Sequence, residues 1–182
     1  MDLLYALAAA ILGFMATGPP LVWSFVAIAI AGIPVILLHE LGHAIAARRL
    51  LDGDVEVVVG TTGKLAELRL GRVLATINVL SHPAGPAGTV GFDDARATAR
   101  DVLWIALAGP LASLLGFVAT AMVLSAVPMQ GVVHDLVWAA VVVNVFGVLN
   151  LIPIELRDGG GSVSRSDGRL ALDALRALWA LR

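Results

Sequence analysis

The sequence predicts a mostly α-helical, polytopic membrane protein with about four transmembrane helices and a small cytoplasmic β-sheet insert between the second and the third. Hydrophobic residues make up 59% of its 182 residues and charged residues only 14%, whereas a soluble domain typically has about a quarter charged and under half apolar residues. This apolar excess is too large for one buried core, so a bilayer is the expected solvent. The apolar stretches that could span it are roughly 3–17, 21–47, 102–127 and 132–152.

The first stretch differs from the other three in length. A spanning helix needs about 20 apolar residues, which the second, third and fourth stretches provide. The first is shorter and is ended by Gly18-Pro19-Pro20, because proline cannot continue a helix. We expect it to form a tight helical hairpin with the second stretch. A buried hairpin inside a soluble protein is the alternative for that segment.

Positive charge is confined to two regions. All 12 Lys and Arg residues lie either between the second and third stretches or after the fourth, and the loops at 18–20 and 128–131 hold none. Because cytoplasmic loops carry an excess of Lys and Arg, we expect residues 48–101 and both termini in the cytoplasm. A composition rich in Ala, Val, Gly and Arg with almost no Lys indicates a bacterium of high GC content, so we expect the membrane to be a bacterial plasma membrane. The net charge of −2 gives no general attraction to nucleic acid.

The insert, at about 48–100, predicts a small β-sheet. Short β-branched runs separated by glycines are typical of strands, and two or three strands are expected. A stretch rich in Gly and Pro, 81–91, predicts a loop. A small sheet has a free edge, and a free edge can accept an extended peptide as an added strand. The runs lie at 55–59, 65–70 and 73–79.

The second stretch carries an H-E-x-x-H motif, His39-Glu40-Leu41-Gly42-His43. Histidines at i and i+4 share one helical face and can both reach one metal ion, and the adjacent glutamate can take a proton from a metal-bound water. Ionisable groups inside a membrane helix are costly and usually functional, although a pair of interfacial histidines is the alternative. The chain has no cysteine, so any metal must be held by His, Asp, Glu or Asn.

Further motifs accompany the H-E-x-x-H motif between about residues 35 and 175. An N-L-I-P sequence ends the fourth stretch and Asp-Gly pairs follow it, while an A-G-P element and two small residues begin the third. Together with H-E-L-G-H, this pattern resembles the site-2 protease family of intramembrane zinc metalloproteases. The matching residues are Ala108-Gly109-Pro110, Ser113, Gly116, Asn144, and Asn150-Leu151-Ile152-Pro153.

In that family an aspartate of a late Asp-Gly pair completes the zinc site, and this sequence has two such pairs. Asp158 has the usual spacing after Asn150 but is followed by a flexible glycine run. Asp167 leads into an amphipathic helix at about 168–181, which resembles the helix after the family's ligand. Ser166 or Asp167 could also cap that helix. We favour Asp167 as the third ligand, with Asp158 as the alternative.

The resemblance implies a zinc-dependent endopeptidase that hydrolyses a peptide bond within or near a transmembrane segment of a membrane-protein substrate. It implies Zn²⁺ held by His39, His43 and an aspartate, with Glu40 as the catalytic acid and base. It also implies that Asn144 and Asn150 position the substrate, although hydrogen bonding between helices is an equal alternative. A catalytically inactive membrane adaptor and a metal-binding membrane protein of the same fold are the alternative functions.

Overall fold

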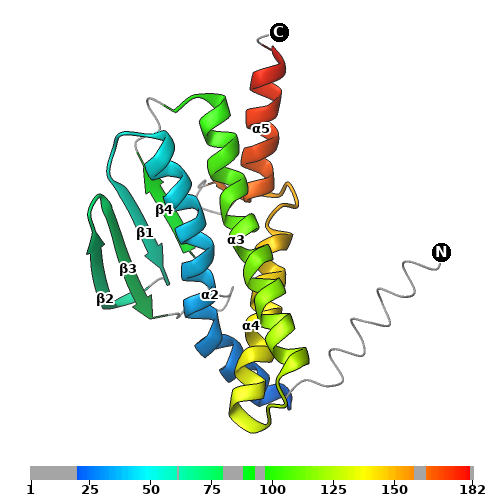
Figure 1. Ribbon diagram of the computed structural model, residues 1–182. Coiled ribbons are helices and arrows are strands. Elements are labelled where there is room, and N and C mark those ends of the chain that lie inside the picture. The colour runs from blue at the N-terminus through cyan, green and yellow to red at the C-terminus, as the bar shows by residue number, and fades with distance from the viewer. Residues whose placement is uncertain (1–19, 61, 80–87, 93–96, 158–162, 181–182) are drawn as a thin grey trace, which may run out of the picture.

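The protein, described here from a computed structural model, is mostly helical, with a small sheet between its first two long helices (Figure 1). The apolar stretch predicted at 3–17 lies outside the residues that the structure describes. Those residues are 20–60, 62–79, 88–92, 97–157 and 163–180.

Three helices of the described residues are long and apolar enough to cross a membrane. They are α2 (Leu21–Leu50), α3 (Ala99–Ala126) and α4 (Gly131–Leu149). At 30, 28 and 19 residues, they match or exceed the roughly 20 residues that a bilayer requires. α2 and α4 run in the same direction and α3 runs opposite to them (Figure 1). We call the end of this bundle where α2 ends and α3 begins the basic end, because Arg48, Arg49 and Arg100 lie there.

The helix ends differ from the predicted boundaries for local reasons. α3 begins three residues before 102, because Thr98 and Asp101 form a capping box: Thr98 Oγ1 accepts from the Asp101 amide (3.2 Å), and Asp101 Oδ2 accepts from the Thr98 amide (3.0 Å). α4 ends at Leu149 rather than at 152. Pro153 follows closely, and a proline disfavours helical backbone in the residue before it.

The sheet has four strands rather than two or three. β1 (Val55–Val59), β2 (Thr62–Leu70) and β3 (Val73–Val79) lie where strands are predicted. The loop predicted at 81–91 is wrong for residues 88–91, because β4 (Gly88–Phe92) pairs antiparallel with β1. Residues 81–87 lie outside the described part of the chain. The strand order is β2-β3-β1-β4, with β1 and β3 parallel.

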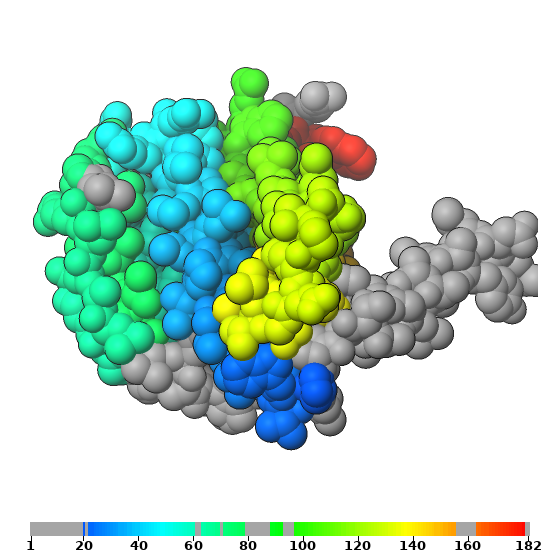
Figure 2. All heavy atoms as spheres, turned by 60° about the horizontal axis from the view of Figure 1, so that its bottom comes forward, coloured from blue at the N-terminus to red at the C-terminus, as the bar shows by residue number. Residues whose placement is uncertain are grey.

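One face of the sheet packs along α2. The β1 side chains Val55, Val57 and Val59 are almost fully buried, against Ala44 and Ala47 among others, and Ile36 and Leu37 pack on the same cluster. β1 therefore runs alongside α2 from the basic end to the level of its middle turns. The sheet lies on one side of α2, and α3 and α4 lie on the other (Figures 1 and 2). This contact brings the edge strand β4 beside the middle of α2.

The opposite end of the bundle is held by a contact between the parallel helices α2 and α4. The Trp23 indole N–H donates to Asp135 Oδ2 at 2.8 Å. Beside it Ala27 and Ala31 pack against Trp138 and Ala139, all buried. Small side chains at such a contact let helix backbones approach closely within a membrane.

The chain after α4 forms a short hairpin and a last helix. β5 (Glu155–Arg157) and β6 (Val163–Arg165) pair antiparallel. α5 (Asp167–Ala180), close to the predicted 168–181, lies beside α3 and buries its small residues Gly168, Ala171 and Ala174. α5 begins at the level of the middle of α2 and extends toward the basic end (Figure 1).

Candidate metal centre

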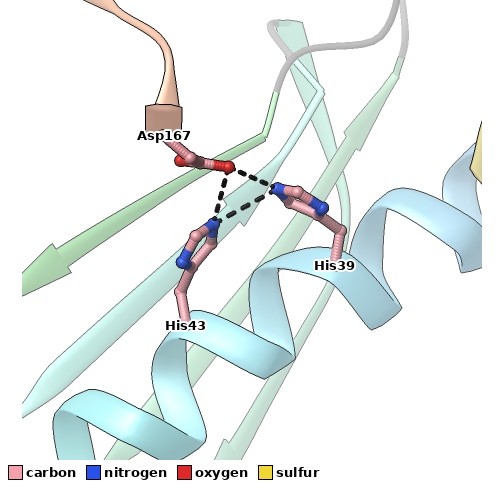
Figure 3. Close-up of side chains that lie close together, drawn as sticks. All are labelled: His39, His43 and Asp167. Atoms are coloured by element: carbon pink, nitrogen blue, oxygen red, sulfur yellow. Dashed lines mark hydrogen bonds and ion pairs between the residues drawn. The ribbon is translucent and has the colours of Figure 1, made fainter. Parts of the chain in front are cut away.

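Two histidines of α2 face Asp167, the first residue of α5 (Figure 3). All three side chains are buried. The Nε2 atoms of His39 and His43 lie 3.2 Å apart. Asp167 Oδ2 lies 3.1 Å from Nε2 of His39 and 3.3 Å from Nε2 of His43. Three potential ligand atoms thus form a compact triangle, and the group could hold a metal ion.

The other ring nitrogen of each histidine meets α3. His43 Nδ1 lies 2.6 Å from the carbonyl oxygen of Ile105, which can only accept, so Nδ1 carries a proton. In the neutral ring Nε2 then holds the lone pair that a metal ion would need. His39 Nδ1 lies 2.9 Å from Ser113 Oγ, and Ser113 is fully buried. Hydrogen bonds of this kind fix the tautomer and the ring orientation of metal-binding histidines.

The Asp167 carboxyl is held in its ionised form. Burial raises the pKa of Asp167, but hydrogen bonds from His39 and His43 and their positive charge lower it, to about 2. A carboxylate must be deprotonated to bind a metal. Asp167 therefore needs no further change of charge to serve as a ligand at neutral pH.

Asp167 reaches the histidines because α5 begins against the end of α4. The Gly168 amide donates to the Asn150 carbonyl oxygen at 2.9 Å. A Cβ added at Gly168 would collide with the Leu151 carbonyl oxygen, so only glycine permits this approach. Asn150 Nδ2 also donates to Asp167 Oδ2 at 2.6 Å. The Asp-Gly pair thus supplies a carboxylate and the room to place it.

Ser166, not Asp167, is the N-cap residue of α5, so the Asp167 side chain can point toward the histidines. Its Oγ accepts a hydrogen bond from the Arg169 amide at 3.2 Å, as an N-cap side chain does. The same hydroxyl bonds the turn after α4, donating to the Ile152 carbonyl at 2.7 Å and accepting from the Ile154 amide at 2.9 Å. Of the two capping alternatives left open by the sequence, the structure shows Ser166.

Glycines of α3 and α4 allow close helix packing around the cluster of His39, His43 and Asp167. A Cβ added at Gly109 of α3 would collide with His43 Nε2, and one at Gly147 of α4 would collide with Ser113 Oγ. α3 therefore approaches α2, and α4 approaches α3, at distances that only glycine permits. The histidine rings have little room to turn away from Asp167.

Glu40 lines a cleft of about 580 Å³ next to the metal cluster. A Cβ added at Gly88 would collide with the Glu40 carboxylate, so the β4 backbone passes directly beside it. β4 is the last strand in the sheet order, and its second edge is unpaired among the described strands. Ser164 and Arg165 of β6 also line this cleft. Its apolar walls come from α2 and α4, through Ile28, Val35, Ile36, Val143 and Phe146.

The two predicted asparagines occupy different positions. Asn150 lines the cleft and its Nδ2 donates to Asp167, so it orients the Asp167 carboxylate. Asn144 is 1% exposed and does not line the cleft. Its Nδ2 donates to the Ala140 carbonyl at 2.9 Å, and its Oδ1, which has no partner among the described residues, faces Gly116 of α3. A role in positioning substrate stays a prediction for both.

The structure brings His39, His43 and Asp167 together, with Glu40 beside them, whereas Asp158 lies outside the described residues. Sequence reasoning missed the bond between Ser113 and His39 and the strand that carries Gly88. The first had a signal, because Gly109 and Ser113 are one helical turn apart and share a face of α3. No protein-family model and no curated protein sequence matches the chain. The interpretation of the site therefore depends on its own geometry.

Proposed function

We propose that this protein is a zinc-dependent intramembrane endopeptidase of the site-2 protease type, which hydrolyses a peptide bond within or near a transmembrane segment of a membrane protein. The observation that carries the proposal is the meeting of His39, His43 and Asp167 beside Glu40. Ionisable groups at this depth of a membrane helix are costly and usually mark function. The basic end would face the cytoplasm of a bacterial cell, since Lys and Arg are enriched there.

The size of the triangle supports zinc. Ligand atoms bonded to Zn²⁺ at about 2.0–2.1 Å in a tetrahedron lie about 3.3–3.4 Å apart. The three observed separations are 3.1, 3.2 and 3.3 Å. Two imidazole nitrogens and one carboxylate are a ligand set of catalytic zinc sites, which keep the fourth position open.

The chemistry divides between the metal and Glu40. A zinc ion bound there would supply Lewis-acid activation of water and of the scissile carbonyl. Glu40, which is adjacent to His39 and lines the cleft, accepts the proton of the attacking water and returns it to the leaving amine. Ser113 and Asn150 hold His39 and Asp167 in place. The apolar cleft walls limit the access of bulk water.

The free edge of β4 supports a route for substrate. Hydrogen bonds within a transmembrane helix shield its peptide groups, so the segment must be extended before cleavage. The binding edge was expected within residues 55–80, but the edge strand of that range, β2, lies at the far side of the sheet. β4 is the edge that borders Glu40. An extended segment added to β4 would pass directly beside the carboxylate.

The test of the function combines metal content with cleavage. The purified protein in detergent should contain about one zinc ion per chain and cleave single-span membrane proteins. Glu40→Gln should retain zinc and lose at least about 100-fold in rate, the usual contribution of a general base. Glu67→Gln, the same change on the exposed strand β2, should retain both the zinc and the wild-type rate. Bound zinc without any Glu40-dependent cleavage would exclude a peptidase and favour a metal-binding role.

A separate experiment tests the strand. Of two adjacent residues in a strand, one directs its N–H to the free edge, so Thr89→Pro and Val90→Pro together cover both cases on β4. We expect one of them to abolish cleavage while zinc is retained. Leu65→Pro on the far edge strand β2 is the control and should leave cleavage nearly unchanged. Equal activity in all three variants would refute strand addition at β4.

A further inference from the structure

A groove of about 630 Å³ lies at the basic end of the bundle, lined by α2, α3 and α4. None of its lining residues lines the Glu40 cleft. Its walls are apolar side chains on one face of α3, at Leu107, Leu111 and Leu114, together with Val148 of α4. Several of them are well exposed, Leu111 at 57%, so the groove opens to the surroundings of the helices.

The basic end of the groove carries its polar groups. Arg49 is the one charged residue among those lining it, and Trp104 lies at the same end. Within the described part of the chain, neither the Arg49 guanidinium nor the Trp104 indole has a hydrogen-bond or ion-pair partner. The groove therefore presents two kinds of donor at one end, and neither has an acceptor among the residues that the structure describes.

The groove has the depth of one bilayer leaflet. From Trp104 to Leu114 the helix rises about 15 Å, and half of a hydrocarbon core of about 30 Å is the same length. Arginine and tryptophan are the residues expected at the level of the headgroups. The donors thus lie at the headgroup level, and the apolar walls extend from there into the hydrocarbon region.

We propose that this groove binds one anionic phospholipid, with an acyl chain along Leu107, Leu111 and Leu114 and the phosphate at Arg49 and Trp104. Basic pockets between transmembrane helices recognise anionic headgroups in this way. Among the described residues that line the groove none is acidic, so none of them offers a negative charge to the ammonium group of a zwitterionic lipid. Selection for net negative charge follows from that absence. This site is independent of the proposed peptidase activity.

The experiment measures lipid retained by the full chain. The protein is reconstituted in vesicles of equal phosphatidylglycerol and phosphatidylcholine, extracted in mild detergent, and its bound lipids are counted by native mass spectrometry. Wild type should retain one phosphatidylglycerol in preference to phosphatidylcholine. Arg49→Gln should lower that preference about fivefold, the effect of about 1 kcal/mol per basic residue at an anionic surface.

Two further variants distinguish lipid binding in the groove from general attraction of anionic lipids to the basic surface. Arg48→Gln makes the same change one position away, on a side chain directed to the β2–β3 turn at Gly71, and should retain the wild-type preference. Leu111→Trp fills the groove and should remove the retained lipid although Arg49 is present. The helical circular dichroism and the elution volume of each variant report that the fold is intact, and Trp104→Phe provides a milder change if Arg49→Gln fails to fold.

Three results would overturn the proposal. Equal losses in Arg48→Gln and Arg49→Gln would mean diffuse attraction to a basic surface. Unchanged retention in Leu111→Trp would mean that no acyl chain occupies the groove. Displacement of the lipid by a transmembrane peptide substrate, added at stoichiometric amounts, would assign the groove to peptide instead.

Discussion

Removing the Ser113 hydroxyl should weaken metal binding without removing any ligand. Ser113 is fully buried, and its Oγ lies 2.9 Å from His39 Nδ1. In Ser113→Ala that buried ring nitrogen loses its hydrogen-bond partner, which costs about 1–3 kcal/mol. The imidazole also becomes free to rotate or to change tautomer. Loss of such a supporting hydrogen bond typically lowers metal affinity about 10- to 100-fold. This loss of affinity lies within the range of the free-energy cost given above.

The assay is competition for zinc against a chelating dye in detergent at pH 7. Ser125→Ala is the matched control, because this serine also lies on α3 but is exposed, and its hydroxyl donates to the Met122 carbonyl at 3.1 Å. We expect the zinc dissociation constant of Ser113→Ala to rise about 10- to 100-fold and that of Ser125→Ala to stay at the wild-type value. If Ser113→Ala bound zinc as tightly as wild type, the proposed role of the α3 contact in orienting His39 would be wrong.

The other predictions concern the glycine wall and the third ligand. Gly109→Ala should abolish zinc binding, because its Cβ would occupy the position of His43 Nε2. Gly91→Ala, whose Cβ would make only an ordinary contact of 3.9 Å with Glu56, should bind normally; equal behaviour of the two would contradict the steric argument. Asp167→Ala should lose zinc and Asp158→Ala should keep it, as measured by metal analysis of the purified proteins. The reverse result would assign the ligand to Asp158.

The part of the site that sequence could predict is the part that depends on one helix. His39 and His43 are four residues apart, so any α-helix places both rings on one face, and the apolar stretch around them predicts that helix. The choice between Asp167 and Asp158 has no such local basis. It depends on the contact of Gly168 with Leu151 and on the bond from Asn150 to Asp167, and both arise only when α4, α5 and α2 meet.

The strand β4 shows why the sheet was only partly predictable. Its sequence, Gly88-Thr-Val-Gly-Phe92, contains two glycines and adjoins a region rich in Gly and Pro, and glycine is disfavoured in strands. Pairing with β1 over five residues and the burial of Val90 and Phe92 against the α2 core override that preference. Glycine at position 88 is itself needed for the approach to Glu40. Gly88 thus makes the strand hard to predict from sequence and also allows its backbone to approach Glu40.

The cluster of His39, His43 and Asp167 joins residues far apart in the chain. His39 and Asp167 are separated by 128 positions, and the sheet, α3 and α4 all lie between them. Because a chain is made from its N-terminus, the histidine pair and Glu40 are synthesised long before their carboxylate partner. The cluster is complete only when α3 and α4 have formed and the chain has returned to α2. The order of synthesis thus delays the assembly of the site until its walls are in place.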